Sequence, residues 1–228
     1  MSIGIKPEPS EKKMFGGLVL VRAGARRSLR STGAAERHRF RRWEARDSGK
    51  ISAVVTAAPD DSSIEAFKIA AERYCAFIDA SESLKRGEFV WQLMEHFVPL
   101  YAAGMRLPLA IGDDDFDAPS AMTHEEWQEL FQRLSTQLGD ADYYSVIFDP
   151  YEFDATPVTG SLADDAADVY RDLKSGLAVI AEGGALEDAV WEWRFGFDNH
   201  WGRHTAEALY ALHALTHPGS VKAISRDE

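Results

Sequence analysis

Residues Trp191 to His204 read WEWRFGFDNHWGRH, and they decide the fold class of this chain. Three of its six tryptophans lie in this stretch, and large aromatic side chains bury enough area to define a core. Their spacing predicts a helix that is apolar on most sides, as interior helices are. We therefore expect an all-α domain with one long helix from about Leu186 to Leu215, which Gly196 and Gly202 bend.

Four further helices are predicted from apolar residues that recur every three or four positions. Their approximate ranges are 62–78, 88–105, 123–138 and 161–181. Thr123 and Glu126 form a capping box at the start of the third. Ser161 is expected to cap the last of these, and Pro99 to kink or split the second. The expected architecture is a single bundle-like domain of about five main helices.

Two long loops are expected to interrupt the helices, at residues 106–122 and 140–160. The second loop contains Tyr143–Phe148, which has the composition of a strand but no obvious partner strand. Loops of this length often line a functional site, although they also serve as packed connectors.

The charge of the chain changes sign near residue 55. Residues 1–54 carry 13 Lys and Arg against 5 Asp and Glu, whereas residues 55–228 carry 12 against 32. We therefore expect a disordered basic tail over residues 1–54 and a folded acidic domain over residues 55–228. The tail could be a basic arm for nucleic acid or a membrane surface, an organelle transit peptide, or a stretch translated from a start codon assigned too early, and we favour the last.

Composition limits the compartment and the partners of the domain. Cys75 is the single cysteine, so an internal disulfide is excluded and a reducing cytoplasm is expected. No apolar run approaches the ~20 residues of a membrane span. The acidic domain is poorly suited to nucleic acid. We expect that the domain binds neither a membrane nor nucleic acid. We also expect a protein partner, whose identity the sequence does not indicate.

The helix over residues 161–181 carries three carboxylates on one strip. Asp165, Asp168 and Asp172 flank its apolar stripe and could hold a magnesium ion. The alternative is a set of salt bridges to Arg171, Lys174 or Arg194. We favour the salt bridges, because the paired Glu-rich motifs of helical pyrophosphohydrolases are missing.

Two histidine pairs have the i, i+4 spacing that can place two imidazoles on one metal ion. His200 with His204 lacks the glutamate that follows the first histidine in H-E-x-x-H, since Trp201 is there. His213 with His217 lies in the last helical turns, where a cationic histidine complements the helix dipole. We therefore expect neither a bound metal ion nor another cofactor.

A polar cluster is expected where the long helix faces its neighbours. Arg194 falls within the apolar arc of the helical wheel, so we expect it to be buried and paired with Asp198, Asp165 or Asp168. The candidate site residues are Asp165, Asp168, Asp172, Glu192, Arg194, Asp198 and His204.

Several separated stretches resemble one family of bacterial proteins. They are DDAADVYRDLK from residue 164, HWG from residue 200, ALYALHAL from residue 208, LPL from residue 107 and DYYSVIFDP from residue 142. Taken together, they resemble domain-of-unknown-function family 5063, over roughly residues 62–216. The resemblance implies a bacterial, cytoplasmic, helical domain. It implies no activity and assigns no catalytic residue.

Two hypotheses for the function follow. The first is a non-catalytic interaction or accessory protein, because no nucleophile–base pair, phosphate loop or dinucleotide motif is present. The alternative is a metal-dependent hydrolase of nucleotides or other phosphoesters. It would use Asp165, Asp168 and Asp172, with Glu192 or His204 added.

Overall fold

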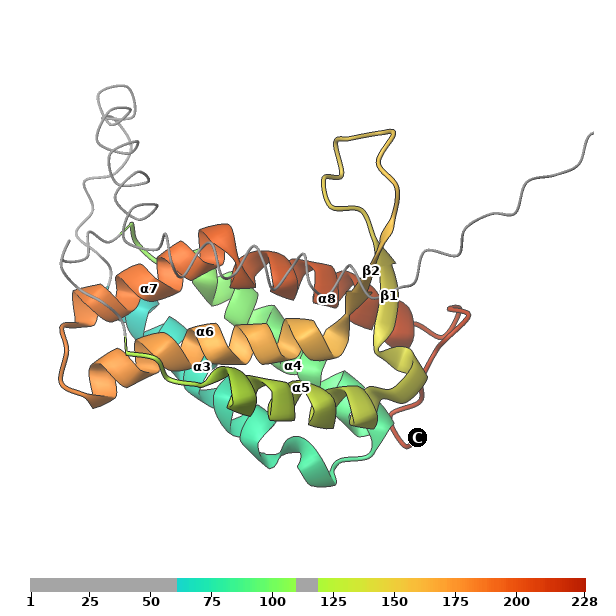
Figure 1. Ribbon diagram of the computed structural model, residues 1–228, viewed down its shortest axis with the longest axis horizontal. Coiled ribbons are helices and arrows are strands. Elements are labelled where there is room, and N and C mark those ends of the chain that lie inside the picture. Colours follow the sequence, from blue (N-terminus) through green and yellow to red (C-terminus); the bar gives the residue numbers. More distant parts are fainter. Residues whose placement is uncertain (1–60, 110–118) are drawn as a thin grey trace, which may run out of the picture. The chain divides into compact units, whose positions relative to one another are not determined.

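The computed structural model describes residues 61–109 and 119–228. The predicted tail over residues 1–54 and most of the predicted loop 106–122 lie outside these ranges. Within them the chain forms six α-helices and two strands (Figure 1): α3 (Asp61–Ala80), α4 (Arg86–Gly104), α5 (His124–Leu138), β1 (Tyr143–Val146), β2 (Val158–Ser161), α6 (Leu162–Ala181), α7 (Leu186–Asn199) and α8 (Trp201–Thr216). The all-α fold class is confirmed.

The helix α6 lies at the centre of the domain. It packs against α3, α5, α7 and α8, and Figure 1 shows it running between α5 and the α7–α8 pair. α4 packs against α3 and α8. An element with neighbours on several sides can place polar side chains where water is largely excluded, and α6 carries the three predicted carboxylates.

Local signals in the sequence set the ends of several helices as predicted. The Thr123 side chain accepts a hydrogen bond from Glu126 N at 3.2 Å, and Glu126 accepts one from Thr123 N at 2.7 Å. Ser161 caps α6 by accepting from Asp164 N. Pro99 neither splits nor ends α4, which continues through it to Gly104.

The core is built around the aromatic residues of the quoted stretch. Trp193 and Trp201 are fully buried, and the ring of Phe67 in α3 lies 5.0 Å from Trp193 and 5.6 Å from Trp201. Each indole nitrogen donates to a backbone carbonyl, of Leu173 and Trp193 respectively, so neither buried N–H is left unsatisfied. In the part of the chain that the structure describes, no helix combines the length and apolar character needed to cross a membrane.

The single long helix predicted from Leu186 to Leu215 is wrong in one respect. The chain breaks at His200, whose φ of −148° and ψ of −83° are not helical, and α7 and α8 are separate helices. Gly202 permits this close turn, because a Cβ there would lie 2.3 Å from the carbonyl oxygen of Phe197. A helical wheel continued across the break therefore assigns the wrong faces to part of the stretch.

The predicted loop 140–160 contains a two-stranded sheet. Tyr143–Phe148 does have a partner strand, because β1 pairs antiparallel with β2, with Tyr143 opposite Ser161 and Val146 opposite Val158. A four-residue strand just before a helix cap gives little signal in a sequence. The hairpin projects from the domain next to the N-terminus of α6 (Figure 1).

Candidate functional site: a histidine–aspartate cluster between α6 and α8

The carboxylates of α6 lie on the face that meets the start of α8. Asp165 and Asp168 are buried, with 1% and 0% of the residue exposed, whereas the Asp172 side chain keeps 21% of its surface exposed. Their spacing of three and four residues places them on one strip, as the sequence predicted. Buried carboxylates require partners, and two histidines at the start of α8 provide them.

Two histidines face this strip from the helix break. His200 lies at the break itself and His204 one turn into α8, and their ring centroids are 4.7 Å apart. The backbone N–H of His204 donates to the His200 carbonyl at 3.3 Å, which holds the two residues in register. The two side chains are therefore neighbours, as their i, i+4 spacing suggests, although His200 is outside the regular helix.

Each imidazole is held through Nδ1 by a different carboxylate. His204 Nδ1 lies 2.6 Å from Asp165 Oδ1, and His200 Nδ1 lies 2.5 Å from Asp172 Oδ2. In a neutral histidine, an Nδ1–H that donates to a carboxylate leaves Nε2 as the ring atom with a free lone pair. The two carboxylates thus fix both the tautomer and the ring orientation.

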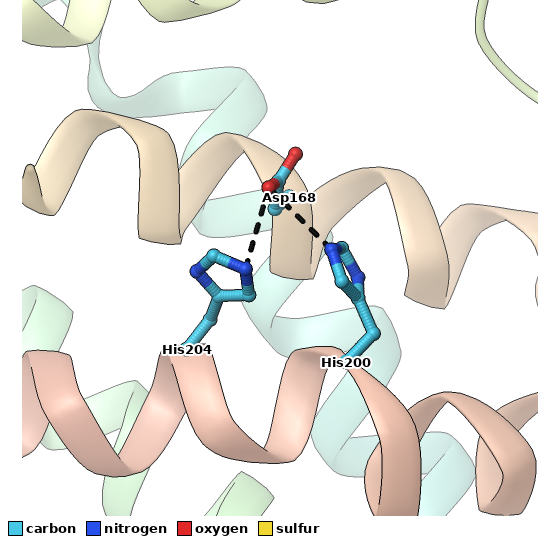
Figure 2. Close-up of side chains that lie close together, drawn as sticks. All are labelled: Asp168, His200 and His204. Carbon is cyan, nitrogen blue, oxygen red and sulfur yellow. Dashed lines mark ion pairs between the residues drawn. The ribbon is translucent and has the colours of Figure 1, made fainter. Parts of the chain in front are cut away.

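Both Nε2 atoms face one oxygen of Asp168, as Figure 2 shows. Asp168 Oδ2 lies 3.5 Å from His204 Nε2 and 3.7 Å from His200 Nε2. The other oxygen, Oδ1, accepts from Trp127 Nε1 at 2.9 Å and lies 3.0 Å from the Arg171 guanidinium. Asp168 is therefore oriented by α5 and by its own helix, and turns Oδ2 toward the imidazoles.

The two carboxylates that hold the imidazoles are in different electrostatic surroundings. Burial raises the pKa of Asp165, although hydrogen bonds to His204 and Tyr144 lower it in part. Burial also acts to raise the pKa of Asp172, but His200 and Arg171 outweigh burial and hold this pKa well below its usual range. Asp172 is consequently a carboxylate at neutral pH and a strong acceptor for His200.

The structure brings together part of the predicted cluster. Asp165, Asp168, Asp172 and His204 meet as the cluster requires, and Arg171 is a salt-bridge partner as the alternative interpretation proposed. His200 joins them and was left out of the candidate list, although its spacing from His204 was a usable signal. Trp127 and Tyr144 were missed because nothing in the sequence indicates which helix or strand faces α6.

The remaining candidates lie elsewhere. Arg194 pairs with Asp198 at 2.9 Å, as one of the predicted alternatives, and donates to the Leu107 carbonyl at 3.0 Å. It contacts no α6 carboxylate and keeps 23% of its side-chain surface exposed, so its predicted burial is wrong. Among the described residues, the side-chain groups with metal-ligand geometry exclude Glu192, Arg194 and Asp198.

Among residues 61–109 and 119–228, two groups of side chains have ligand atoms close enough for one metal ion. In each group, Asp168, His200 and His204 or Asp164, Asp165 and His204, the ligand atoms lie within 4.8 Å of one another. In the second group, Asp165 is already bound to His204 Nδ1 and to the Tyr144 hydroxyl. The first group is the better candidate, because both Nε2 atoms face the same oxygen of Asp168.

These features define the class of the protein as a helical-bundle domain with a histidine–aspartate cluster between two helices. The chain belongs to the family described as Domain of unknown function (DUF5063), whose model matches residues 60–218. The resemblance inferred from the sequence is thus confirmed.

One solved structure supports the fold. The crystal structure of protein BF1032 from Bacteroides fragilis is similar to the chain, with 25% sequence identity and a TM-score of 0.59. The similarity covers 69% of this chain and 97% of the other. None of the curated proteins matches the chain.

Proposed function

We propose that the domain binds a divalent transition-metal ion through Asp168 Oδ2, His200 Nε2 and His204 Nε2. One observation carries this proposal. Both Nε2 atoms face the same carboxylate oxygen, at 3.7 Å and 3.5 Å, while both Nδ1 atoms are held by other carboxylates. The proposal departs from the expectation of no metal, because the sequence did not reveal that α6 faces the two histidines.

The distances suit a metal ion with bonds of ordinary length. Metal–nitrogen and metal–oxygen bonds of about 2.0–2.1 Å at tetrahedral angles place neighbouring ligand atoms about 3.3–3.4 Å apart. The observed separations of Asp168 Oδ2 from the two Nε2 atoms, 3.5 Å and 3.7 Å, are close to this value. Two imidazoles and one carboxylate favour Zn²⁺, Co²⁺ or Fe²⁺ over Mg²⁺ and Ca²⁺, which prefer oxygen ligands alone.

The surroundings of the three ligands support a metal site further. Histidine ligands usually donate their second N–H to a carboxylate or carbonyl, which orients the ring and raises its basicity. Asp165 does this for His204, and Asp172 for His200.

Three protein ligands leave at least one coordination position for water or a substrate, as in catalytic zinc sites. A metal ion in such a site lowers the pKa of its bound water and makes it a nucleophile near neutral pH. We therefore retain metal-dependent hydrolysis as the chemistry that the site would support. The ligands would be Asp168, His200 and His204 rather than the three carboxylates of α6.

The proposal is tested by metal titration of the full chain without a histidine tag. After treatment with a chelator, the protein is titrated with Zn²⁺, Co²⁺ and Mg²⁺ by calorimetry. We expect one Zn²⁺ or Co²⁺ per chain and no comparable binding of Mg²⁺. His200→Ala and His204→Ala should each weaken Zn²⁺ binding by at least roughly 10-fold.

A matched control lies on α8. His213 and His217 have the same spacing, and both are exposed. His213→Ala should therefore leave the affinity for Zn²⁺ unchanged. The proposal fails if the wild-type chain binds no stoichiometric Zn²⁺ or Co²⁺, or if His213→Ala weakens binding as much as His204→Ala does.

A second candidate function, protein binding, is favoured by the tip of the hairpin. Phe148, Tyr151 and Phe153 are 68%, 85% and 95% exposed. Asp149, Glu152 and Asp154 are interspersed with them, so a partner surface with apolar pockets and basic rims would be complementary. Replacing Tyr151 and Phe153 by serine should preserve the thermal midpoint. The variant should no longer form the complexes with protein partners that the wild-type chain forms. Complexes that persist would assign binding to another surface.

The compartment belongs to the same proposal. A single cysteine at position 75 fits a reducing compartment, and the similar solved structure comes from a bacterium. We therefore propose a bacterial cytoplasmic protein. Cell fractionation with an antibody against the domain tests this, and recovery outside the cytoplasmic fraction would contradict it.

A further inference from the structure

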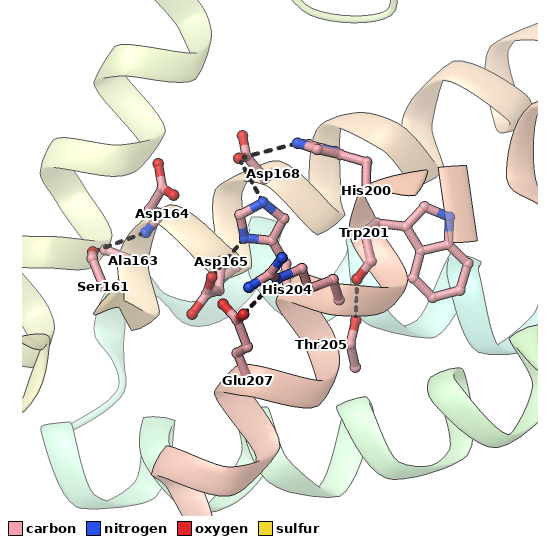
Figure 3. Close-up of polar contacts among 12 residues, drawn as sticks. Ser161, Ala163, Asp164, Asp165, Asp168, His200, Trp201, His204, Thr205 and Glu207 are labelled. Atoms are coloured by element: carbon pink, nitrogen blue, oxygen red, sulfur yellow. Dashed lines mark hydrogen bonds and ion pairs between the residues drawn. The ribbon is translucent and has the colours of Figure 1, made fainter. Parts of the chain in front are cut away.

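The hairpin reaches the histidine–aspartate cluster through one side chain. The Tyr144 hydroxyl, on β1, donates to Asp165 Oδ2 at 2.6 Å. The other oxygen of Asp165 lies 2.6 Å from His204 Nδ1, and His204 Nε2 faces Asp168. Figure 3 shows the imidazole of His204 between Asp165 and Asp168. A continuous chain of polar contacts therefore connects β1 with the proposed metal ligands.

The strand pairing fixes the position of Tyr144. Its partner across the sheet is Gly160, and a Cβ there would lie 2.5 Å from the tyrosine ring. The ring therefore lies over the glycine in space that no other residue type would leave. β2 in turn leads directly into α6 at Ser161, so the strand opposite Tyr144 is continuous with the helix that carries the carboxylate strip.

A buried aspartate connects the hairpin with α6 and α5. Asp142 Oδ1 accepts from Ser161 Oγ at 2.8 Å and from Ala163 N at 2.9 Å, and its Oδ2 accepts from Ser135 Oγ at 2.7 Å. These bonds tie the start of β1 to the first turn of α6 and to α5. These bonds therefore fix the strand that carries Tyr144 relative to the helix that carries Asp165.

A second contact joins the hairpin to α8. The Arg203 guanidinium lies 3.7 Å from the ring centroid of Phe148 and donates to the Phe148 carbonyl. Arg203 precedes His204 in the chain. The hairpin therefore contacts the residue next to His204 and also the carboxylate that orients the His204 imidazole.

We propose that the β1–β2 hairpin sets the metal affinity of the site, with Tyr144 as a positioning residue that holds Asp165 against His204. The proposal rests on the proposed function. Without the hydroxyl, Asp165 loses the donor on Oδ2 within a buried environment. The carboxylate is then held only through Oδ1, so His204 loses part of the orientation and basicity that a carboxylate at Nδ1 gives a metal ligand.

The test is the Zn²⁺ affinity of Tyr144→Phe in the full chain, with Tyr143→Phe as the matched control. Tyr143 is the neighbouring residue on β1 and is exposed, so its variant removes the same hydroxyl without touching the cluster. We expect Tyr144→Phe to weaken Zn²⁺ binding roughly 3- to 10-fold, which is less than the loss expected when a side chain that hydrogen-bonds directly to a metal ligand is removed. Tyr143→Phe should bind as the wild type does.

A double-mutant cycle with Asp165→Asn separates positioning from a general structural effect. Because Tyr144 acts through Asp165, Tyr144→Phe should have little further effect in the Asp165→Asn chain. Affinities are measured where circular dichroism shows all variants folded. The proposal is overturned if Tyr144→Phe binds Zn²⁺ as tightly as the wild type, or if its loss is undiminished beside Asp165→Asn. Absence of Zn²⁺ binding by the wild type would instead refute the proposed function itself.

Discussion

At the scale of single residues, Arg194 shows how a side chain on an apolar arc can avoid full burial. Its guanidinium reaches Asp198 and the carbonyl of Leu107, and lies 5.7 Å from the ring centroid of Phe197. The long stem of arginine lets the charged group stay near water while the rest packs. The residue therefore ties the chain after α4 to α7 and takes no part in the cluster.

Arg194→Ala should destabilise the domain by about 1–2 kcal/mol, because it removes a partly exposed ion pair and a charged hydrogen bond to a carbonyl. A fully buried unpaired charge would instead cost ~3–5 kcal/mol. Urea denaturation measures the difference. The matched control is Lys68→Ala, which removes an i, i+4 ion pair to Glu72 and should cost only ~0–0.5 kcal/mol. Equal losses in both variants would contradict the role of the Leu107 carbonyl.

At the scale of elements, the break between α7 and α8 positions both histidines. An uninterrupted helix would keep His200 in the regular wheel, whereas here it occupies the N-cap position of α8 and its ring reaches Asp172 on α6. Trp201, directly after the break, is fully buried and anchors the start of α8. The same short stretch thus provides the core and the candidate ligands.

Gly202→Ala should destabilise the domain by about 2–3 kcal/mol, because the new Cβ would lie 2.3 Å from the Phe197 carbonyl oxygen, a backbone atom that cannot move aside cheaply. Thermal unfolding followed by circular dichroism measures the loss. Gly219→Ala is the control, since its nearest neighbours are side-chain atoms of His217 at 3.4 Å. A Gly202→Ala protein as stable as the Gly219→Ala protein would show that the turn has room to relax.

At the scale of the whole domain, the C-terminal segment closes over α4. Ile224 is buried, and its N–H donates to the Leu215 carbonyl at 2.7 Å. Arg226 binds Glu88 at 2.8 Å and Glu95 at 2.9 Å. Contacts between residues so far apart in the chain stabilise the domain only once α4 and α8 have packed.

This closure predicts a pH dependence. Hydrogen bonds from Arg226 and Gln92 lower the pKa of Glu88 to about 2. Because the folded pKa lies below the unfolded value of about 4.3, the stabilisation is present above that value and is lost as the pH falls toward 2. Arg226→Gln should therefore lower the thermal midpoint at pH 7, and its difference from wild type should shrink below about pH 4.3. A difference independent of pH would rule out the ion pairs as its cause.

The basic segment over residues 1–54 lies outside the described residues, and its role stays a prediction. Its composition lacks the apolar periodicity of a folded element. A chain beginning at Val55 should therefore keep the thermal midpoint of the full chain. A decrease of several degrees would show that the segment contributes to the fold, and the intact mass of the native protein decides whether translation begins at Met1.

The sequence by itself determined the positions of α3 to α6, the caps of α5 and α6, and the strip of carboxylates on α6. Periodicity and capping act within a few residues, so Thr123, Ser161 and the Asp165–Asp168–Asp172 spacing could be interpreted without a structure. The family resemblance came from the same local stretches. Even the His200–His204 spacing was visible, although nothing assigned it a partner.

Only the tertiary structure decided that the two imidazoles face Asp168. That arrangement depends on the break at His200, on the packing of α8 against α6, and on the strand register that brings Tyr144 to Asp165. Each is an interaction between residues distant in sequence, whose energy exists only after the chain has folded. Local pattern therefore predicts which residues are polar and where each helix begins, but packing decides which of them meet.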